Sequence, residues 1–520
     1  MRAKGVSLRA LQGVSSRPRL ADVQPGFGGG LNTTASDTEL SPSQMRFCTN
    51  GLLSQFGDVT KRLGTRRLHS AAIASAPIRN GICWRTATTH EYLVACNGAL
   101  YSGGVYSSNM TWTNKGALFT GTNYPFFAPF RDAASAESVY IADGGTFKKY
   151  SAGTLSAPAG ATSGLTVLSV YNQRVFGVTG ADQTLYYSAL NDGDTIGTAS
   201  GGSAVIRTFS SQKITGLLTL RGSLAIFHVS GISRFTGYTQ DDIAIGAGTI
   251  GISTDTGTIS PRSMIAVDGV GFFLSERGAY MVNEGGVQRM DTPASPDPLV
   301  PIMTQLAISD FEMIDVTYDK SSKTIRWTIP GTGVYLYHIP LNAWSGPWDG
   351  GYTDVVTHCL FDGLNASGLP ITVVGGSDGF LRHCDYTGTY LDNVLYDGTG
   401  GTTYTLRIQC RRMYTSAEES EKAWRWAYLF ADLRGTVTAS FSWITNTGAG
   451  TFTLPATASG SIWGSFTWGF FTWGGSGAAP FRIPLGDRGT YIDITIADDG
   501  EAASVYSRVT LEAFDYGRRG

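Results

Sequence analysis

The sequence predicts an all-β fold, an interrupted β-propeller of about seven blade-like units with an N-terminal arm and a C-terminal β-sandwich or jelly roll. Between residues 76 and 395, short aromatic or aliphatic strands follow a glycine or a tight turn at intervals of about forty to fifty residues, which is the repeat length of propeller blades. The 67 glycines and 12% aromatic residues suit a chain of many strands and turns. After residue 392 the spacing changes, which indicates a second β unit.

Residues 1–75 are expected to form an arm and an attachment segment. The first twenty residues contain Arg and Lys but no Asp or Glu, so they read as a basic arm. The glycines of residues 27–33 allow backbone angles that other residues resist. Residues 43–53 permit a short helix with a serine cap. Residues 57–64 read as a turn, a strand and a second turn.

Residues 76–395 are expected to form the propeller, because one kind of anchor recurs there. Each anchor is a glycine or turn followed by an aromatic or aliphatic strand, and the turns between strands use Asn-Gly and Asp-Gly, as hairpins prefer. Insertions interrupt the ring near residues 190–215 and 285–325, and a helix over residues 301–309 would fit the second. The anchors are residues 98–101, 145–147, 184–187, 231–235, 278–280, 333–335 and 379–381.

Residues 396–520 are expected to form the separate β-sandwich or jelly roll, with strands near 403–413, 437–443, 450–454, 482–485, 491–497 and 504–514. A glycine-rich segment inside it carries Trp463, Trp468 and Trp473. We favour packing of a hairpin, within the core or between subunits, as their role. The alternatives are an aromatic platform for a glycan and an apolar tip for lipid, and these three residues are our candidates for a distal aromatic contact.

Composition limits the function classes. Net charge is −2, so bulk basicity does not point to nucleic acid. Charged residues make up 15%, against about 25% in typical soluble domains, which indicates a surface covered by other subunits unless Ser, Thr and Asn supply solubility. The six scattered cysteines read as buried free thiols made in a reducing cytoplasm. No signal peptide and no run of eighteen apolar residues is present, so we expect no stable membrane insertion.

No catalytic or cofactor motif is found, so we expect no enzyme activity and no cofactor. His358-Cys359 and His383-Cys384 could in principle hold zinc, but adjacent strand residues point to opposite faces, which disfavours a shared metal. Asp498-Asp499 reads as an exposed loop pair. Asp241 and Asp242 lie in a loop between two blades and are candidates for lining a channel, with a solvated outer turn as the alternative.

Four stretches, taken in order, resemble the tail nozzle family of short-tailed bacteriophages, also called tail tubular protein B or tail stabilisation protein. The opening stretch has Phe-Gly-Gly-Gly-Leu-Asn-Thr at residues 27–33, Asn50 and Asp-Val-Thr-Lys-Arg-Leu-Gly at 58–64. The others are residues 170–176 continuing to 185–188 and Asp192, residues 257–263 with 270–275 and 278–280, and residues 342–344 with 375–380. The likeness covers most of residues 26–400; the basic arm and the tryptophans have no match in it.

The resemblance implies a structural component of the phage tail, located in the virion and assembled in the host cytoplasm. It implies a homo-oligomeric ring, a hexamer, below the portal and adaptor proteins, which gives a channel for the passage of double-stranded DNA, with tail fibre or spike proteins as further partners. Attachment candidates in the opening stretch are Phe27, Leu31, Asn32, Lys61 and Arg62. The alternatives are a receptor- or carbohydrate-binding propeller at a tail tip, and a propeller enzyme that acts on glycans.

Overall fold

The regular secondary structure of the described residues is nearly all β, which confirms the all-β part of the predicted fold class. The computed structural model describes residues 19–515, except 88–89, 107–108, 119–122, 209–211, 246–248, 293–295, 350–356, 388, 415–419, 434–438 and 455–479. The described part holds many small antiparallel sheets and a few short helices. None of the described helices is long and apolar enough to span a bilayer.

Seven sets of four antiparallel strands succeed one another along the chain, and in the first six sets the strand order follows the sequence. The first three sets are β7 (Ile78–Arg85), β8 (His90–Cys96), β9 (Ala99–Gly103) and β10 (Trp112–Ala117); β11 (Phe126–Arg131), β12 (Glu137–Ala142), β13 (Lys148–Ser151) and β14 (Thr154–Ser156); and β15 (Val167–Tyr171), β16 (Arg174–Val178), β17 (Thr184–Tyr187) and β18 (Gly202–Val205). The next three are β19 (Ile214–Thr219), β20 (Leu224–His228), β21 (Ile232–Phe235) and β22 (Thr249–Ser253); β23 (Ile265–Val267), β24 (Val270–Ser275), β25 (Gly278–Asn283) and β26 (Gly286–Arg289); and β27 (Asp315–Asp319), β28 (Thr324–Ile329), β29 (Gly333–His338) and β30 (Ala343–Trp348).

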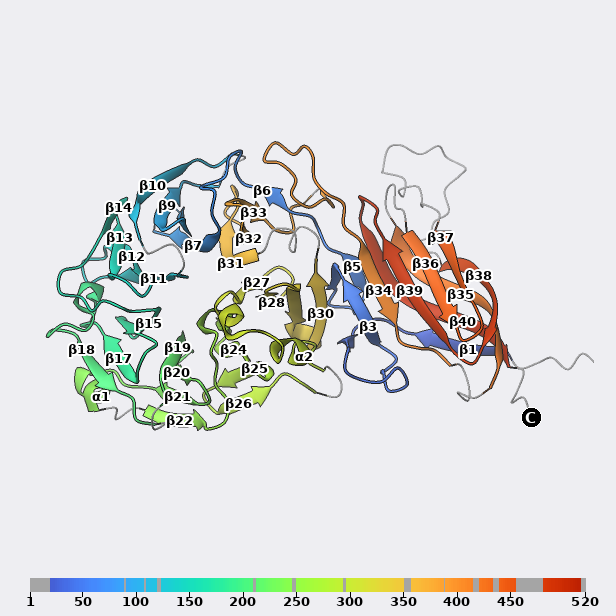
Figure 1. Ribbon diagram of the computed structural model, residues 1–520, viewed down its shortest axis with the longest axis horizontal. Helices are drawn as coiled ribbons and strands as arrows, with labels where there is room; N and C mark the ends of the chain where they lie inside the picture. Colours follow the sequence, from blue (N-terminus) through green and yellow to red (C-terminus); the bar gives the residue numbers. More distant parts are fainter. Residues whose placement is uncertain are drawn as a thin grey trace, which may run out of the picture.

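The seventh set closes a circle. It combines β31 (Thr357–Leu364), β32 (Pro370–Gly376) and β33 (Leu381–His383) with β6 (Arg66–Arg67), a strand that precedes the first set in the sequence. The first strands contact one another in the order β7, β11, β15, β19, β23, β27 and β31, and β31 contacts β7. The seven sets are therefore arranged in a circle (Figure 1), and we refer to β7–β33 together with β6 as the ring.

The remaining strands form two facing sheets, the C-terminal unit. One sheet contains β1 (Arg19–Gln24), β4 (Gly51–Leu53), β5 (Val59–Lys61), β35 (Lys422–Leu433), β38 (Pro480–Gly489) and β40 (Ser504–Asp515). The other contains β2 (Gly30–Leu31), β3 (Gln44–Thr49), β34 (Leu406–Cys410), β36 (Ala439–Thr445), β37 (Ala449–Leu454) and β39 (Ile492–Asp498). Alternate residues of β36 and β39 are buried, as expected for strands with one face on a core.

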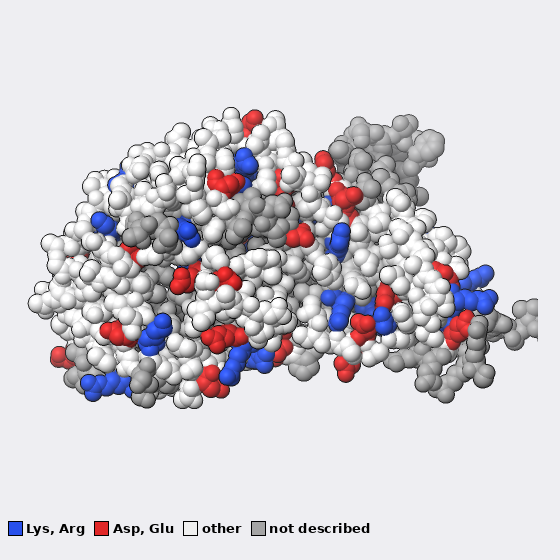
Figure 2. Space-filling model, viewed as in Figure 1, with Lys and Arg blue, Asp and Glu red and all other residues white. Residues whose placement is uncertain are grey.

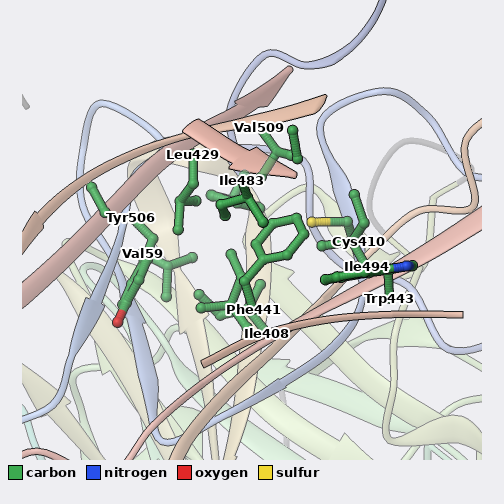
Figure 3. Packing of buried hydrophobic residues seen from close by; sticks show 14 of the residues in the cluster. Val59, Ile408, Cys410, Leu429, Phe441, Trp443, Ile483, Ile494, Tyr506 and Val509 are labelled. Carbon is green, nitrogen blue, oxygen red and sulfur yellow. The ribbon is translucent and has the colours of Figure 1, made fainter. Parts of the chain in front are cut away.

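Apolar side chains from both sheets meet in one core between them (Figure 3). Leu429, Ile483 and Val509 come from one sheet, and Ile408 and Phe441 come from the other. Burial of each such side chain contributes about 1.5–3 kcal/mol. The two-sheet arrangement agrees with the predicted sandwich, but it also recruits N-terminal strands. The described part of residues 1–75 is therefore divided between this unit and the ring.

One sheet runs from the ring into the C-terminal unit without a break. Strand β3 pairs with β34 on one side and touches β30 through Cys48 and Gly346 on the other. The ten strands thus joined reach from β27 in the ring to β37 in the C-terminal unit. The link between β3 and β30 is narrow, since it consists of the single bridge pair Cys48 and Gly346 and a hydrogen bond from the Asn50 N–H to the carbonyl of Pro347 at 3.1 Å.

The helices differ in part from the expectation. The prediction of a short helix at residues 43–53 is wrong. This segment forms β3 and β4, because β3 pairs with β34, far along the chain, and β4 pairs with β5. The helix expected near residues 301–309 is confirmed only as two short pieces, α2 (Val300–Met303) and the 3₁₀-helix Ile308–Glu312. A further helix, α1 (Gln240–Ile245), follows β21, and the other 3₁₀-helices are Gly193–Thr195, Pro261–Ser263 and Ile339–Leu341.

Candidate functional site

The chain crosses between the ring and the C-terminal unit at two places that lie side by side. The first crossing, residues 62–65, leads from β5 to β6, and the second, residues 384–405, leads from β33 to β34. The Thr65 N–H donates to the carbonyl of Leu391 at 3.1 Å, and the Val394 N–H donates to the carbonyl of Thr65 at 3.0 Å. Because the crossings are bonded to each other, they form one junction between the two units.

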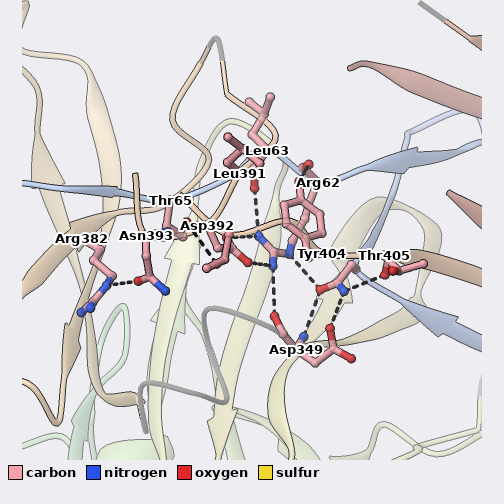
Figure 4. A network of polar contacts seen from close by, with 12 residues as sticks. Arg62, Leu63, Thr65, Asp349, Arg382, Leu391, Asp392, Asn393, Tyr404 and Thr405 are labelled. Atoms are coloured by element: carbon pink, nitrogen blue, oxygen red, sulfur yellow. Dashed lines mark hydrogen bonds and ion pairs between the residues drawn. The ribbon is translucent and has the colours of Figure 1, made fainter. Parts of the chain in front are cut away.

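A buried arginine holds this junction together (Figure 4). Arg62 is 1% exposed, and its guanidinium donates to both carboxylate oxygens of Asp392, at 2.8 and 2.5 Å. It also donates to Asn50 Oδ1 at 3.0 Å and to the carbonyl of Asp349, which follows β30, at 3.0 Å. The ring of Tyr404 lies 3.8 Å from the guanidinium carbon. Arg62 therefore links both crossings to the sixth set of the ring.

The neighbouring Lys61 is buried on the side of the C-terminal unit. Its Nζ donates to the carbonyls of Gly500 at 2.6 Å and Asp498 at 3.1 Å, and lies 3.6 Å from Asp498 Oδ1. Burial lowers the pKa of Lys61, although Asp498 and Asp499 oppose that shift. The Tyr506 hydroxyl donates to Asp498 Oδ2 at 2.9 Å. The expectation that Asp498 lies in an exposed loop is thus wrong, since a buried strand end holds it against a cation.

Two stretches that carry the family resemblance meet beside the junction. Gly30 has φ +69°, and a Cβ there would lie 2.7 Å from the carbonyl oxygen of Trp344, so only glycine fits. Leu31 and Trp344 belong to the same apolar cluster. Residues 27–33 and 342–344, about three hundred positions apart in the sequence, therefore pack against each other.

The five attachment candidates are buried inside the chain's own fold. Phe27 lies in the core between the two sheets, and Lys61 and Arg62 are paired as described. These side chains pack within the chain's own fold, and a role of this stretch in attachment to another protein stays a prediction. Their exposed fractions are 0% for Phe27, 2% for Leu31, 3% for Asn32, 4% for Lys61 and 1% for Arg62.

The ring carries a partly open pocket of about 280 Å³ beside the ends of its first and second strands. Five of the side chains in its wall are Tyr124, Asp143, Thr166, Thr215 and Arg262, which belong to four different sets of strands. Asp143 Oδ1 accepts from the Gly145 N–H at 2.7 Å, and burial raises the pKa of Asp143. Carboxylate, hydroxyl and guanidinium groups therefore surround a space large enough for a small polar molecule.

Side chains from four sets contact one another at the centre of the ring. Arg262 pairs with Asp315 at 2.5 Å, and its guanidinium lies 4.6 Å from the centre of the Tyr124 ring. Arg79 lies 4.9 Å from the same ring and donates to the Tyr124 hydroxyl at 2.9 Å. The major groove of B-DNA alone is about 12 Å wide. A DNA duplex therefore does not pass through the ring of one chain.

The six cysteines and His358 are buried inside the fold. All six cysteines are free and buried, which confirms the expectation for the thiols. His358 lies 3.2 Å from the Tyr124 hydroxyl, and burial lowers the pKa of His358 to about 4. Its neighbour Cys359 packs in an apolar cluster with residues of β7 and β8. Within the described ranges, no group of three or more His, Cys, Asp and Glu side chains is placed to hold a metal.

The other predicted residues lie far from both places. Asp241 and Asp242 lie in the first turn of α1 and not in a loop as expected, and α1 packs on β18, the outermost strand of its set, at the outer edge of the ring (Figure 1). Asp242 Oδ2 accepts from the Thr239 N–H at 3.0 Å, and hydrogen bonds from Thr239 lower the pKa of Asp242. A position in a lumen between copies stays a prediction. Trp463, Trp468 and Trp473 lie outside the described residues.

The comparisons with known proteins leave the family open. No protein-family model and no curated protein matches the chain. Among solved structures, the chain is similar to the extracellular domain of a protein described as a hybrid two-component system from B. thetaiotaomicron, with 10% identity and a TM-score of 0.43. The match covers 62% of this chain, which spans 39% of that one. A likeness at this level carries no argument about fold or function.

Proposed function

We propose that the chain is a structural component of a bacteriophage tail and forms a ring-shaped nozzle below the portal and adaptor. Each copy contributes a seven-bladed β-propeller, closed by the N-terminal strand β6, and a β-sandwich. The observation that carries the proposal is the junction: the opening stretch of the family resemblance packs against residues 342–344 and supplies Arg62 to the buried network. This buried junction, with the bridge pair between β3 and β30, supports a fixed orientation of the two units, which suits a subunit of a closed assembly.

The molecular surface also favours assembly. Charged side chains are sparse over the face in Figure 2, and only 15% of the residues are charged. Large apolar side chains are exposed near the outermost strands of the third and fourth sets, with Val205 51%, Tyr238 69% and Ile250 53% exposed. Where such side chains form a contiguous patch, they mark a surface that contacts another protein. We propose that this edge contacts the next copy in a hexamer.

The closed centre of the ring determines where DNA can pass. Because Arg79, Tyr124, Arg262 and Asp315 fill the centre, a genome channel has to lie between copies and not through one of them. Tail fibre or spike proteins would bind the outside of the assembled nozzle. The proposed location is the tail of the virion, after assembly in the host cytoplasm.

Binding to purified adaptor and portal proteins tests the proposal. We expect the wild-type chain to be retained by an adaptor or adaptor–portal ring, and the variant Tyr238→Asp with Ile250→Asp to be retained as a monomer but not to form a ring. A wild-type chain that binds neither protein at micromolar concentrations would contradict the proposal.

A receptor- or carbohydrate-binding propeller is the second candidate function, favoured by the pocket of about 280 Å³ at the centre of the ring. Its mixture of carboxylate, hydroxyl and guanidinium groups suits a polyhydroxylated ligand. Saturable binding of host glycans, abolished by Asp143→Asn, would favour this candidate. Hydrolysis of the glycan by the purified chain would instead favour a propeller enzyme.

A further inference from the structure

The pocket of the ring contains a buried carboxylate that is not balanced by an ion pair. Asp143 lines the pocket and is 3% exposed. Its Oδ1 accepts from the Gly145 N–H at 2.7 Å, whereas its Oδ2 accepts no hydrogen bond from a described residue. Burial raises the pKa of Asp143, and the charge of Lys148, which is not in an ion pair with it, opposes this shift only in part. A donor with a positive charge would therefore relieve an unfavourable burial.

The other charged side chains of the pocket do not neutralise Asp143. Arg262 is 5% exposed, and its guanidinium is bound to Asp315 at 2.5 Å, so its charge is already balanced. Lys213 and Glu312 have opposite charges and are both exposed, where water and salt screen them. Among the described residues of the wall, Asp143 is thus the buried charge that lacks a partner of opposite sign.

The hydroxyl groups of the wall add further acceptors. Thr166 Oγ1 donates to the carbonyl of Val178 at 3.3 Å, and Thr215 Oγ1 donates to the carbonyl of Thr258 at 2.6 Å. Because each hydroxyl has a single hydrogen, both oxygens can only accept from a ligand, as can the ionised carboxylate of Asp143. These groups match a ligand end that only donates, and an ammonium group has three N–H donors and no acceptor.

An apolar wall accompanies these acceptors. Phe126 and Val167 stand at the starts of β11 and β15, and Ile259 and Pro261 precede β23. Such a wall favours a ligand with a carbon skeleton over a hydrated metal ion, which would need oxygen ligands on several sides. The volume of about 280 Å³ lies just below the range of about 300–1,000 Å³ for drug-sized ligands, so the ligand is small.

We propose that this pocket binds a small organic ammonium ion. The ammonium group donates to Asp143, with the Thr166 and Thr215 hydroxyls as further acceptors, and the carbon skeleton packs against the apolar wall. Hydrogen bonds between ionised partners are stronger than neutral ones, so the pocket selects the cation over an alcohol of the same shape. This inference goes beyond the nozzle and does not depend on it.

Ligand titration by nuclear magnetic resonance with the full-length chain tests the inference. The probe is n-butylamine, and its neutral counterpart is 1-butanol, which has a hydroxyl in place of the ammonium group. We expect saturable binding of n-butylamine at one site per chain, at least about tenfold tighter than that of 1-butanol. The affinity for n-butylamine should fall as acid protonates Asp143, since n-butylamine itself stays charged.

Three variants locate the site. Asp143→Asn removes the charge but can still accept from the Gly145 N–H, and should lower the affinity for n-butylamine at least about tenfold. Its matched control is Asp268→Asn, which removes the same charge from an exposed turn of the ring and should leave binding unchanged; φ there is +51°, which Asn tolerates. Lys213→Gln removes a cation from the pocket wall, so it should strengthen binding of n-butylamine.

Four results would each overturn the inference: equal affinities for n-butylamine and 1-butanol, unchanged binding in Asp143→Asn, an equal loss in Asp268→Asn, and weaker binding in Lys213→Gln. The pair of probes and Lys213→Gln decide the matter even where Asp143→Asn does not fold. Tighter binding of glucose than of n-butylamine would also overturn it and would favour the second candidate function. Adaptor binding is a separate measurement, so this inference and the nozzle proposal fail independently.

Discussion

Replacing Arg62 by Ala tests whether the junction fixes the ring to the C-terminal unit. The change removes the cation that lies 2.5 Å from Asp392 and leaves this carboxylate buried, since both side chains are 0% exposed. It also removes donors to Asn50 and to the carbonyl of Asp349. Removing one partner of a buried pair costs about 3–5 kcal/mol, because the other charge stays desolvated without compensation.

Urea denaturation, followed by tryptophan fluorescence, measures this loss, and limited proteolysis shows where the chain opens. We expect the free energy of unfolding to fall by about 3–5 kcal/mol and new cleavage to occur in residues 384–405. The matched control is Arg85→Ala, which breaks a pair with Asp362 whose side chains are 42% and 54% exposed and should cost less than about 1 kcal/mol. An Arg62→Ala loss no larger than that of the control would refute the reasoning.

Four further predictions concern other parts of the chain. Gly379→Val should cost at least about 1–3 kcal/mol, because φ is +75° and a Cβ would lie 2.0 Å from the Ala74 carbonyl oxygen, whereas Gly104→Val, in open space, should leave the melting temperature nearly unchanged. His69 accepts from the Leu381 N–H through Nε2 at 2.9 Å, and burial lowers the pKa of His69 from 6.5 to about 4, so its stabilising effect is complete above pH 6.5 and is lost as the pH falls towards 4. Between pH 7 and pH 5, the free energy of unfolding measured by urea titration should therefore fall by about 2 kcal/mol more for the wild-type protein than for His69→Gln. The same fall in both proteins would exclude this role of His69. The six buried thiols should resist alkylation in native protein and react only on unfolding, and rapid native labelling would disprove this. If α1 faces the lumen of the assembly, Asp241→Lys with Asp242→Lys should slow DNA ejection at low salt and restore it at high salt; ejection at the wild-type rate at every salt concentration would remove α1 from the channel.

Local patterns were enough to predict the class of fold. Turns such as Asn97-Gly98, with φ of +49° and +71°, mark hairpins because few other residue types adopt such angles. Gly278 and Gly379, which open two of the anchor segments, have φ of +114° and +75°. These turns depend on residues that are adjacent in the chain, so a single sequence is enough to predict them.

The junction could not be predicted, because its contacts join residues far apart in the sequence. Arg62 and Asp392 are separated by 330 positions, and although Arg62 lies in the stretch at residues 58–64 that carries the family resemblance, nothing in the sequence pairs it with Asp392. Residues 43–53 have the local pattern of a helix, yet β3 gains partners on both sides from β30 and β34. The structure shows why this segment is a strand: Gln44, Met45, Cys48 and Thr49 are all buried, which suits a strand inside a sheet. Polar residues such as Gln44 and Thr49 gave no sign of this burial in the sequence.

Electron microscopy of the purified chain, alone and bound to the adaptor, tests the nozzle most directly. We predict a closed ring of six copies around an axial opening, with the propellers arranged about that opening. A chain of 55.4 kDa that stays monomeric in the presence of adaptor, or an assembly without an axial opening, would contradict the account.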